Sequence, residues 1–421
     1  GLPLLGQGNR IIEALANCDL KVKGITFQNG RQIGYLPGGA IFFAGNKLEV
    51  DSCRFIDNQA GSCGGAIGAR AQTVIVKNSY FQGDNILGGG ARGAAIMQCG
   101  PATGTIRGTL SVQNCAFYNC TTQTHGYSYV IAIYDSSLSN EGGGYSNTGK
   151  IDVTNCTFSE NSSVTTYQAA IDVSDGDCDV YLVNNTFYKN SECAFRLMSN
   201  KAFLANNVIV GARQGIMTDY KVADGRTPMV AMNNIVVGTE GGINGGIDDA
   251  CFTSAAATNN NTISTTAAYP LTKTALASSL STDNFVPYLP ITSTSSTLID
   301  AGTDNVLAQF GANYVLTTDT RGLLANNKKD IGAYEYLALT GISFPTYVSE
   351  NYQVSLSENT LTVKNRSEKS FTLTVVNVAG KTVCSTRVAS SVELDKSRFG
   401  KGVFILLLTD GTETGSRKVV F

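Results

Sequence analysis

Residues 112–119 read Val-Gln-Asn-Cys-Ala-Phe-Tyr-Asn, and altered copies of this stretch recur along residues 9–250. One copy, residues 153–161, reads Val-Thr-Asn-Cys-Thr-Phe-Ser-Glu-Asn, and another, residues 182–190, reads Leu-Val-Asn-Asn-Thr-Phe-Tyr-Lys-Asn. A period that varies by whole loops is typical of a solenoid. A single coil cannot bury its apolar face, but stacked coils can.

Each copy carries one apolar anchor and, farther along, a second short strand. The anchors are Phe27, Phe55, Phe81, Phe117, Phe158, Phe187, Ile209 and Val236. The second strands are residues 39–42, 65–68, 94–97, 131–134, 169–172, 193–196 and 214–217. Because no helical pattern separates these strands, the repeat predicts a parallel β-helix. Alternation then places the Val, Cys and Phe positions inward, each roughly 4.8 Å from its equivalent in the next coil.

Asparagine recurs immediately before the inward Cys position. The six residues are Asn78, Asn114, Asn155, Asn184, Asn206 and Asn233. We expect their side chains to stack in a hydrogen-bonded ladder along the helix axis. The alternative interpretation is that Asn simply favours turns at this point of the coil.

Composition and charge agree with an all-β chain. The 421 residues include 45 Gly and no Trp, only 15% are charged, and the net charge is −2. Many glycines and short strands rich in Val, Ile, Phe and Thr indicate strands and turns. The absence of a basic patch argues against a nucleic-acid partner. No apolar run reaches the roughly 18 residues that a membrane-spanning helix needs.

The chain begins at Gly1 without a basic leader, so we expect a removed signal peptide or a truncated sequence. The 11 Cys residues have irregular spacings, which fit neither a small disulfide framework nor a zinc motif. Since several occupy one repeat position, we expect most of them to be buried free thiols.

The repeat resembles two known groups. Its aliphatic, aromatic and Asn positions look like the stacks of right-handed, pectate-lyase-like β-helices. The Phe-X-X-Asn motifs at residues 55–58, 158–161 and 187–190, and the Gly-Gly-Ala-Ile motifs at 38–41 and 64–67, are similar to repeats of polymorphic outer-membrane adhesins. The resemblance implies a right-handed, single-stranded parallel β-helix, a scaffold that hosts many activities.

After residue 250 the repeat fades, and residues 251–300 are expected to form irregular coils or a long excursion packed on the helix. Residues 298–302, 319–322 and 330–336 are similar to the closing segment of secreted bacterial β-helix proteins of the choice-of-anchor Q type. A capping role follows, because the last coil would otherwise expose an apolar end. We expect Asp330 and Glu335 to pair with Arg321 there, which closes a first domain at residues 1–336.

Residues 337–421 show alternating strands separated by turns such as Asp410-Gly411. They predict a second domain, an antiparallel, Ig-like β-sandwich of about seven strands. Residues 377–383, 402–405 and 418–420 resemble C-terminal sorting domains of the type IX secretion system of Bacteroidetes-like bacteria. The usual Tyr-Pro-Asn-Pro opening is absent, and a plain surface-attached Ig-like module is the alternative.

A candidate site lies on the outward column of the second strands. Tyr134, Asp172 and Arg196 are predicted on three adjacent coils, about 5 Å apart each. An aromatic ring beside an acid and a base suits sugar recognition, because the ring stacks on a pyranose and the charges bind hydroxyls or a carboxylate. The alternative is an ordinary surface ladder with an Asp172–Arg196 ion pair.

Two enzyme mechanisms compete on this face. A uronate lyase would use Arg196 as base, with Asp172 nearby and calcium held by Asp175 and Asp177. A glycoside hydrolase would use two carboxylates, for which Asp135 and Asp172 are the candidates. The turn at residues 175–179 lacks the Gly and Glu of a complete calcium loop, so a solvated acidic turn is the alternative.

Two long insertions, after Phe81 and Phe117, are expected to wall a groove over the Tyr134 face. The second insertion supplies Glu141 and Tyr145 as further candidate substrate contacts. It also carries His125, the one histidine, which excludes a multi-His metal site.

These features predict a secreted or cell-surface β-helix protein that binds a polysaccharide or surface glycan, with cleavage by a lyase or glycosidase as an open alternative. A non-catalytic adhesin or structural protein is the second hypothesis. No cofactor is expected beyond calcium, and we expect a monomer.

Overall fold

The computed structural model describes most of the 421 residues. The described residues are 8–15, 18–34, 37–88, 91–100, 107–123, 126–133, 148–164, 168–173, 178–197, 201–218, 230–237, 258–259, 261–264, 273–302, 319–321, 329–336, 347–348, 352–357, 359–367, 369–377, 381–400, 402–409 and 414–420. The chain divides into two compact units, Gly1–Tyr336 and Leu337–Phe421. Each unit is described by itself below.

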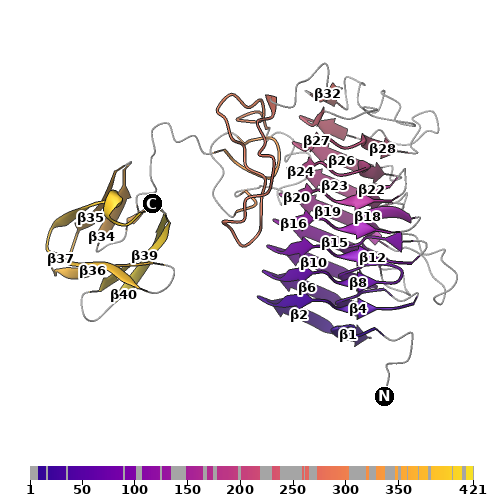
Figure 1. Ribbon diagram of the computed structural model, residues 1–421, viewed down its shortest axis with the longest axis horizontal. Helices are drawn as coiled ribbons and strands as arrows, with labels where there is room; N and C mark the ends of the chain where they lie inside the picture. Colours follow the sequence, from indigo (N-terminus) through magenta and orange to yellow (C-terminus); the bar gives the residue numbers. More distant parts are fainter. Residues whose placement is uncertain are drawn as a thin grey trace. The chain divides into compact units, whose positions relative to one another are not determined.

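The first unit is a parallel β-helix built from three long sheets and one short sheet (Figure 1). Sheet A contains β1 (Ile12–Leu15), β5 (Ile41–Ala44), β9 (Ile67–Ala69), β14 (Ile96–Gln98), β18 (Gly126–Ile133), β22 (Ala169–Val173), β25 (Cys193–Leu197) and β28 (Gln214–Thr218), and β13 (Ala91–Arg92) also pairs with β18. Sheet B contains β2 (Asp19–Lys23), β6 (Lys47–Asp51), β10 (Thr73–Lys77), β15 (Gly108–Gln113), β19 (Thr148–Thr154), β23 (Asp179–Val183), β26 (Lys201–Ala205), β29 (Val230–Met232) and β31 (Thr258–Asn259).

Sheets C and D complete each coil. Sheet C contains β3 (Thr26–Gln28), β7 (Arg54–Ile56), β11 (Tyr80–Gln82), β16 (Ala116–Tyr118), β20 (Thr157–Ser159), β24 (Thr186–Tyr188), β27 (Val208–Val210), β30 (Ile235–Val237) and β32 (Thr262–Ser264). Sheet D contains β4 (Arg31–Gln32), β8 (Gln59–Ala60), β12 (Asn85–Ile86), β17 (Thr121–Thr122) and β21 (Ser162–Ser163). Strands β31 and β32 continue sheets B and C past residue 250, where the sequence pattern predicts irregular coils.

The aromatic anchors form one continuous column inside the helix. Successive rings from Phe27 to Phe187 stack with centroids 4.4–4.9 Å apart. Ile209 and Val236 extend the column in the same register. Every Phe in it is at most 2% exposed, so the column is the apolar core that the repeat predicts. Stacked rings of this kind combine apolar burial with favourable ring–ring contact.

The predicted Asn column forms a side-chain ladder in part, since Asn114 Nδ2 donates to Asn78 Oδ1 at 3.3 Å and Asn78 Nδ2 donates to Asp51 Oδ1 at 3.0 Å. The six predicted Asn residues have φ between 51° and 55° and make the turn from sheet B to sheet C. Asn tolerates this left-handed conformation better than most residues. The continuous ladder is formed by the next position, where Asn185, Asn207, Asn234 and Asn261 are joined by Nδ2–Oδ1 bonds of 2.9–3.0 Å.

A second ladder lies at the turn between sheets C and D. Asn58 Nδ2 donates to Asp84 Oδ1 at 2.9 Å, and Asn161 Nδ2 donates to Asn190 Oδ1 at 2.9 Å. Asn58, Asn161 and Asn190 are the Asn residues of the Phe-X-X-Asn motifs. The motif residues that carry the resemblance therefore serve internal packing.

The chain returns along the side of the helix. We call the described residues 273–302, 319–321 and 329–336 the lateral segment; it is coloured orange in Figure 1. Its Ile291, Leu298 and Ile331 pack in one buried cluster with sheet C residues such as Val208 and Val237. These contacts cover the outer face of sheet C at β24, β27 and β30. The predicted capping of the helix end stays a prediction.

The second unit is a β-sandwich of two antiparallel sheets. One sheet contains β33 (Tyr347–Val348), β34 (Tyr352–Leu356), β35 (Thr360–Asn365) and β38 (Ser391–Asp395), and the other contains β36 (Phe371–Asn377), β37 (Thr382–Val388), β39 (Val403–Thr409) and β40 (Thr414–Val420). Both sheets contribute to one buried cluster that includes Val363, Leu373 and Leu406. A short 3₁₀ helix, η4 (Lys396–Arg398), follows β38.

The predicted fold class, an all-β chain with a parallel β-helix followed by a small antiparallel β-sandwich, is confirmed. Among the described residues, none forms a helix long and apolar enough to cross a membrane.

Candidate functional site

Asp172 and Arg196 are paired on adjacent coils, as the sequence predicts. Asp172 on β22 lies in register with Arg196 on β25, and Arg196 Nη1 is 3.6 Å from Asp172 Oδ1. The Asp172 side chain is 0% exposed, however, and that of Arg196 is only 14% exposed. The outer face of sheet A is thus covered here, so the expected open sugar-binding face is wrong at Asp172.

The outward column contains Ala132 at the position that was predicted for Tyr134. Strand pairing places Ala132, and not Tyr134, beside Asp172. Ile131 and Ile133 are both buried, so from the sequence either one could be aligned with Ile171 of the next coil. In the structure Ile131 is the residue that pairs with Ile171, after a register shift between Ser128 and Ile131. Tyr134, Asp135, Glu141 and Tyr145 lie outside the described residues.

The predicted calcium ligands Asp175 and Asp177 also lie outside the described residues, as does His125. Within the described part of the chain, no group of three or more His, Cys, Asp or Glu side chains could hold a metal ion. Calcium binding at residues 175–179 therefore stays a prediction.

The outer face of sheet B brings an aromatic pair together with charged groups. Tyr181 on β23 and Phe203 on β26 are in register, and their rings stack at 5.1 Å with an interplanar angle of 5°. The Lys150 Nζ atom lies 4.9 Å from the centroid of the Tyr181 ring. Asp152 is in register with Tyr181, and Asp179 is in register with Lys150. We call Lys150, Asp152, Asp179, Tyr181 and Phe203 the sheet B patch.

The sheet B patch sits on a rigid base and reaches solvent. Four of its side chains are half-buried and Asp152 is 8% exposed. Partial burial raises the pKa of Tyr181, and the nearby Asp179 and Asp152 carboxylates raise it further, so the phenol stays neutral. The patch can therefore offer a ring, neutral hydroxyl, carboxylates and an ammonium group to one ligand.

The same face is different at the other end of sheet B. Glu49 contacts three lysines, Lys21 at 3.0 Å, Lys77 at 3.3 Å and Lys47 at 3.6 Å. Hydrogen bonds from Lys21 and Lys77 lower the pKa of Glu49. These charges satisfy one another across three coils, as in an ordinary solvated ladder.

The lateral segment holds a second polar cluster. Arg321 pairs with Asp319, its Nε lying 2.6 Å from Asp319 Oδ2, and its Nη2 donates to the Glu335 carbonyl oxygen at 2.7 Å. The predicted partners Asp330 and Glu335 instead accept backbone N–H groups: Asp330 Oδ1 accepts from Asp300, and both Glu335 carboxyl oxygens accept from Asp330. The predicted side-chain pairing with Arg321 is wrong, because Arg321 pairs with the Asp319 carboxylate instead. This cluster ties the lateral segment together.

Sequence reasoning missed the sheet B patch, although a signal for it exists. In residues 179–183 the apolar Val180 and Leu182 alternate with Asp179 and Tyr181, which predicts that the latter two point outward. The same period places Phe203 outward between Ala202 and Leu204. An outward aromatic pair on neighbouring coils is the feature that distinguishes this part of the helix.

Comparison with known proteins identifies the C-terminal part of the chain. Residues 356–421 match the family described as the secretion system C-terminal sorting domain. No curated protein and no solved structure matches the chain. The match indicates export by the type IX secretion system, so this is a secreted or cell-surface protein.

Proposed function

We propose that this exported protein binds polysaccharide without cleaving it, through the sheet B patch. The observation that carries the proposal is the half-buried Tyr181–Phe203 pair on adjacent strands of one continuous sheet. Aromatic side chains supply apolar contact area, and a Tyr hydroxyl is a group that can both donate and accept hydrogen bonds. The resemblance to pectate-lyase-like helices adds to the case for a glycan ligand.

Charged neighbours supply the polar part of the recognition. Lys150 lies against the Tyr181 ring, and Asp152 and Asp179 flank it in the strand register. Hydrogen bonds from charged groups are stronger than those between neutral groups, so these side chains can hold sugar hydroxyls or a uronate carboxylate. Their placement on strands keeps them in fixed positions, which lowers the entropic cost of binding.

Two observations weigh against cleavage by the sequence-predicted catalytic residues Asp172 and Arg196. A glycoside hydrolase needs two carboxylates flanking the scissile bond at about 5–9.5 Å, but Asp172 is fully buried. A lyase base must reach the proton beside the sugar carboxylate, whereas the Arg196 side chain is only 14% exposed and lies 3.6 Å from Asp172 Oδ1. Binding without chemistry is therefore the simpler assignment.

The test is a screen of neutral and uronate-containing polysaccharides by retention on the insoluble polymer or by glycan array. We expect at least one class to be retained, with binding at least tenfold weaker in Tyr181→Ala. Ile75→Ala is the matched control, because Ile75 occupies the same outward column nearer the other end of sheet B. Equal binding by both variants would overturn the assignment to this patch.

Cleavage is measured in the same screen by the absorbance of unsaturated products and by new reducing ends. We expect neither signal from the wild-type protein. Unsaturated products that disappear in Arg196→Ala would instead establish the lyase. If no polysaccharide is bound, the second hypothesis gains: a non-catalytic adhesin, which the adhesin-like motifs favour and whose patch would contact a protein surface.

A further inference from the structure

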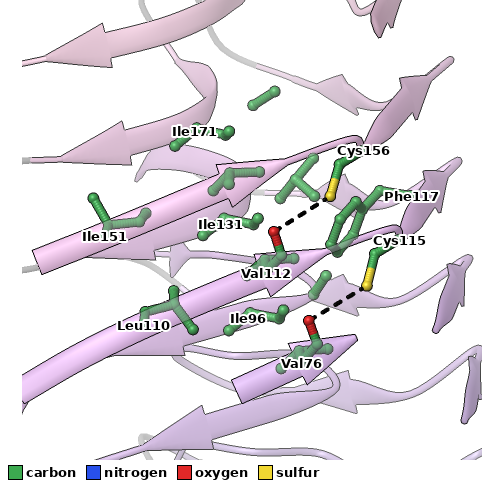
Figure 2. Packing of buried hydrophobic residues seen from close by; sticks show 14 of the residues in the cluster. Val76, Ile96, Leu110, Val112, Cys115, Phe117, Ile131, Ile151, Cys156 and Ile171 are labelled. Carbon is green, nitrogen blue, oxygen red and sulfur yellow. Dashed lines mark hydrogen bonds between the residues drawn. The ribbon is translucent and has the colours of Figure 1, made fainter. Parts of the chain in front are cut away.

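A column of sulfur and hydroxyl side chains lines the inner turn between sheets B and C. In the register of the flanking strands its members are Cys53, Ser79, Cys115 and Cys156. Only the last two are cysteines on neighbouring coils, as Figure 2 shows. Their backbones are joined directly, because Thr157 N donates to Cys115 O at 2.9 Å.

The two cysteines occupy equivalent positions of neighbouring coils, and in this structure both are free thiols that donate to backbone carbonyl oxygens. Cys156 Sγ is 3.6 Å from Val112 O, an atom of the coil that carries Cys115 (Figure 2). Two residues farther on, the Phe117 and Phe158 rings are 4.7 Å apart, which gives the local spacing of the coils. Strands of one sheet lie about 4.8 Å apart, and disulfide-bonded residues have Cα atoms about 4.4–6.8 Å apart. Burial raises the pKa of the Cys156 thiol, and the neighbouring Cys115 adds to the effect.

The route of the chain supplies an oxidising environment. The sorting domain at residues 356–421 takes the protein out of the cell. Disulfides form and persist in exported proteins, whereas cytosolic thiols are kept reduced. We propose that Cys115 and Cys156 form a disulfide in the exported protein, which links the β15–β16 coil covalently to the β19–β20 coil.

The chemistry is a two-step thiol–disulfide exchange. One cysteine thiolate attacks the disulfide of a thiol oxidoreductase, forming a mixed disulfide and releasing one thiolate of that protein. The second cysteine thiolate then attacks the mixed disulfide, so the Cys115–Cys156 bond forms and the oxidoreductase leaves as a dithiol. Two thiols are oxidised and one disulfide is reduced. Because both side chains are 0% exposed once folded, the exchange takes place before the coils close.

The test uses full-length protein collected outside the secreting cells. It is denatured without reductant, alkylated at free thiols, digested and analysed by mass spectrometry. We expect one peptide pair joined through Cys115 and Cys156, while the remaining cysteines are alkylated. Full alkylation of Cys115 and Cys156, or linkage of either to another cysteine, would overturn the proposal.

Variants separate a disulfide from simple packing. In the wild type, we expect reductant to lower the melting temperature. In Cys156→Ser, Cys115 should become alkylated, and reductant should no longer change the melting temperature. Serine is tolerated at this position of the coil, since Ser79 occupies it naturally. Cys53→Ser is the matched control, because Ser79 separates Cys53 from Cys115. It should keep both the linked peptide and the sensitivity to reductant.

Discussion

At the scale of single residues, Asp84 stands out because it replaces Asn in a buried ladder. Asp84 Oδ1 accepts both the N–H and the Nδ2 of Asn58 at 2.9 Å. In the same ladder, Asn161 Nδ2 donates to Phe117 O and Asn190 Nδ2 donates to Phe158 O, both at 3.1 Å. Asp84 has the carboxyl oxygen Oδ2 at the position where Asn161 and Asn190 have the donor Nδ2. Its complete burial raises the pKa well above the ordinary value, so we infer a protonated, neutral carboxyl.

We predict that Asp84→Asn stabilises the protein. The unfolded carboxyl ionises near its ordinary pKa of 3.8, whereas the folded one keeps its proton to much higher pH. The contribution of the Asp84 carboxyl to the free energy of unfolding is therefore fully present below about pH 3.8 and is lost as the pH rises from there through the higher pKa of the folded state. Asn supplies the missing donor without a charge, and should raise the free energy of unfolding by about 1–3 kcal/mol at neutral pH.

Thermal unfolding of the wild type and of Asp84→Asn between about pH 4 and pH 9 measures this difference. The melting temperature of Asp84→Asn should depend less on pH than that of the wild type. The melting temperature of Asn58→Asp, which adds a second carboxyl to the ladder, should depend more on pH. Parallel curves for all three proteins would show that Asp84 is not the titrating group.

The apolar columns could be predicted from sequence because each position repeats the same burial. Phe117 and Ile171 were assigned inward from their period alone, and both are 0% exposed. The predicted ladder is present between Asn114 and Asn78, but the longer ladder lies one residue farther along, and the sequence does not separate the two because both columns carry Asn, as at Asn184 and Asn185. Asn114 has φ 51° and makes the turn, while Cys115 occupies the inward position that Asn185 fills in a later coil.

At the scale of elements, the lateral segment is held to sheet C by a mixture of apolar and polar contacts. Gly332 N donates to Asn206 O and Ala333 N donates to Thr186 Oγ1, both at 2.9 Å. Asp330 and Glu335 flank these contacts and are at most 3% exposed. Burial raises the pKa of Asp330 to about 6 and that of Glu335, which also neighbours the Asp330 carboxyl, to about 8.

We predict that the lateral segment weakens as pH rises through these values. The pKa of the Glu335 carboxyl is 4.5 without its neighbours and about 8 in the fold. Its contribution is thus complete below about pH 4.5, falls as pH rises and is gone above about pH 8. Glu335→Gln keeps a neutral group at every pH and should remove this part of the loss.

Limited proteolysis across that pH range is the measurement. Cleavage within residues 273–336 should accelerate with pH in the wild type and less so in Glu335→Gln. Glu393→Gln changes an exposed carboxylate of β38 in the sandwich unit and serves as the control. Equal acceleration in Glu335→Gln and Glu393→Gln would refute the prediction.

Strand positions were predictable where alternation was regular. The sequence alternates regularly at residues 353–356 and 371–376, and these residues fall within β34 and β36. Strands β37 and β38 were missed as separate strands, because their outward residues are mostly polar and the apolar alternation is short. The predicted register of sheet A is wrong at β18, because Ile131 and Ile133 fit the same apolar pattern. The irregularity between Ser128 and Ile131 that brings Ile131 into register with Ile171 has no signal in the sequence.

At the scale of the whole molecule, the inner and outer sides of the helix carry separate information. Inward side chains must pack on their equivalents in the neighbouring coils, so the same residue types recur there and the fold can be predicted from the repeat. Outward positions differ from coil to coil: Glu49, Ser111 and Tyr181 occupy one column of sheet B. A binding surface can therefore change without altering the core, which is why this scaffold alone does not specify a function.

Export fixes the setting in which such a surface acts. The sorting domain makes the protein secreted or surface-attached, where polysaccharides are accessible and disulfides persist. The glycan proposal and the disulfide proposal depend on different residues, which lie on the outside and the inside of the helix and share only the β19–β20 coil. Either can fail without the other.

The most direct measurement of the central claim uses the absence of tryptophan from this chain. Phe203→Trp places a single indole in the sheet B patch, and Ile75→Trp places one in the same column away from it. Titration with a polysaccharide retained in the screen should change the emission of the Phe203→Trp protein in a saturable way and leave that of Ile75→Trp constant. Retention of the polysaccharide by both proteins without any change in the emission of the Phe203→Trp protein would contradict binding at this patch.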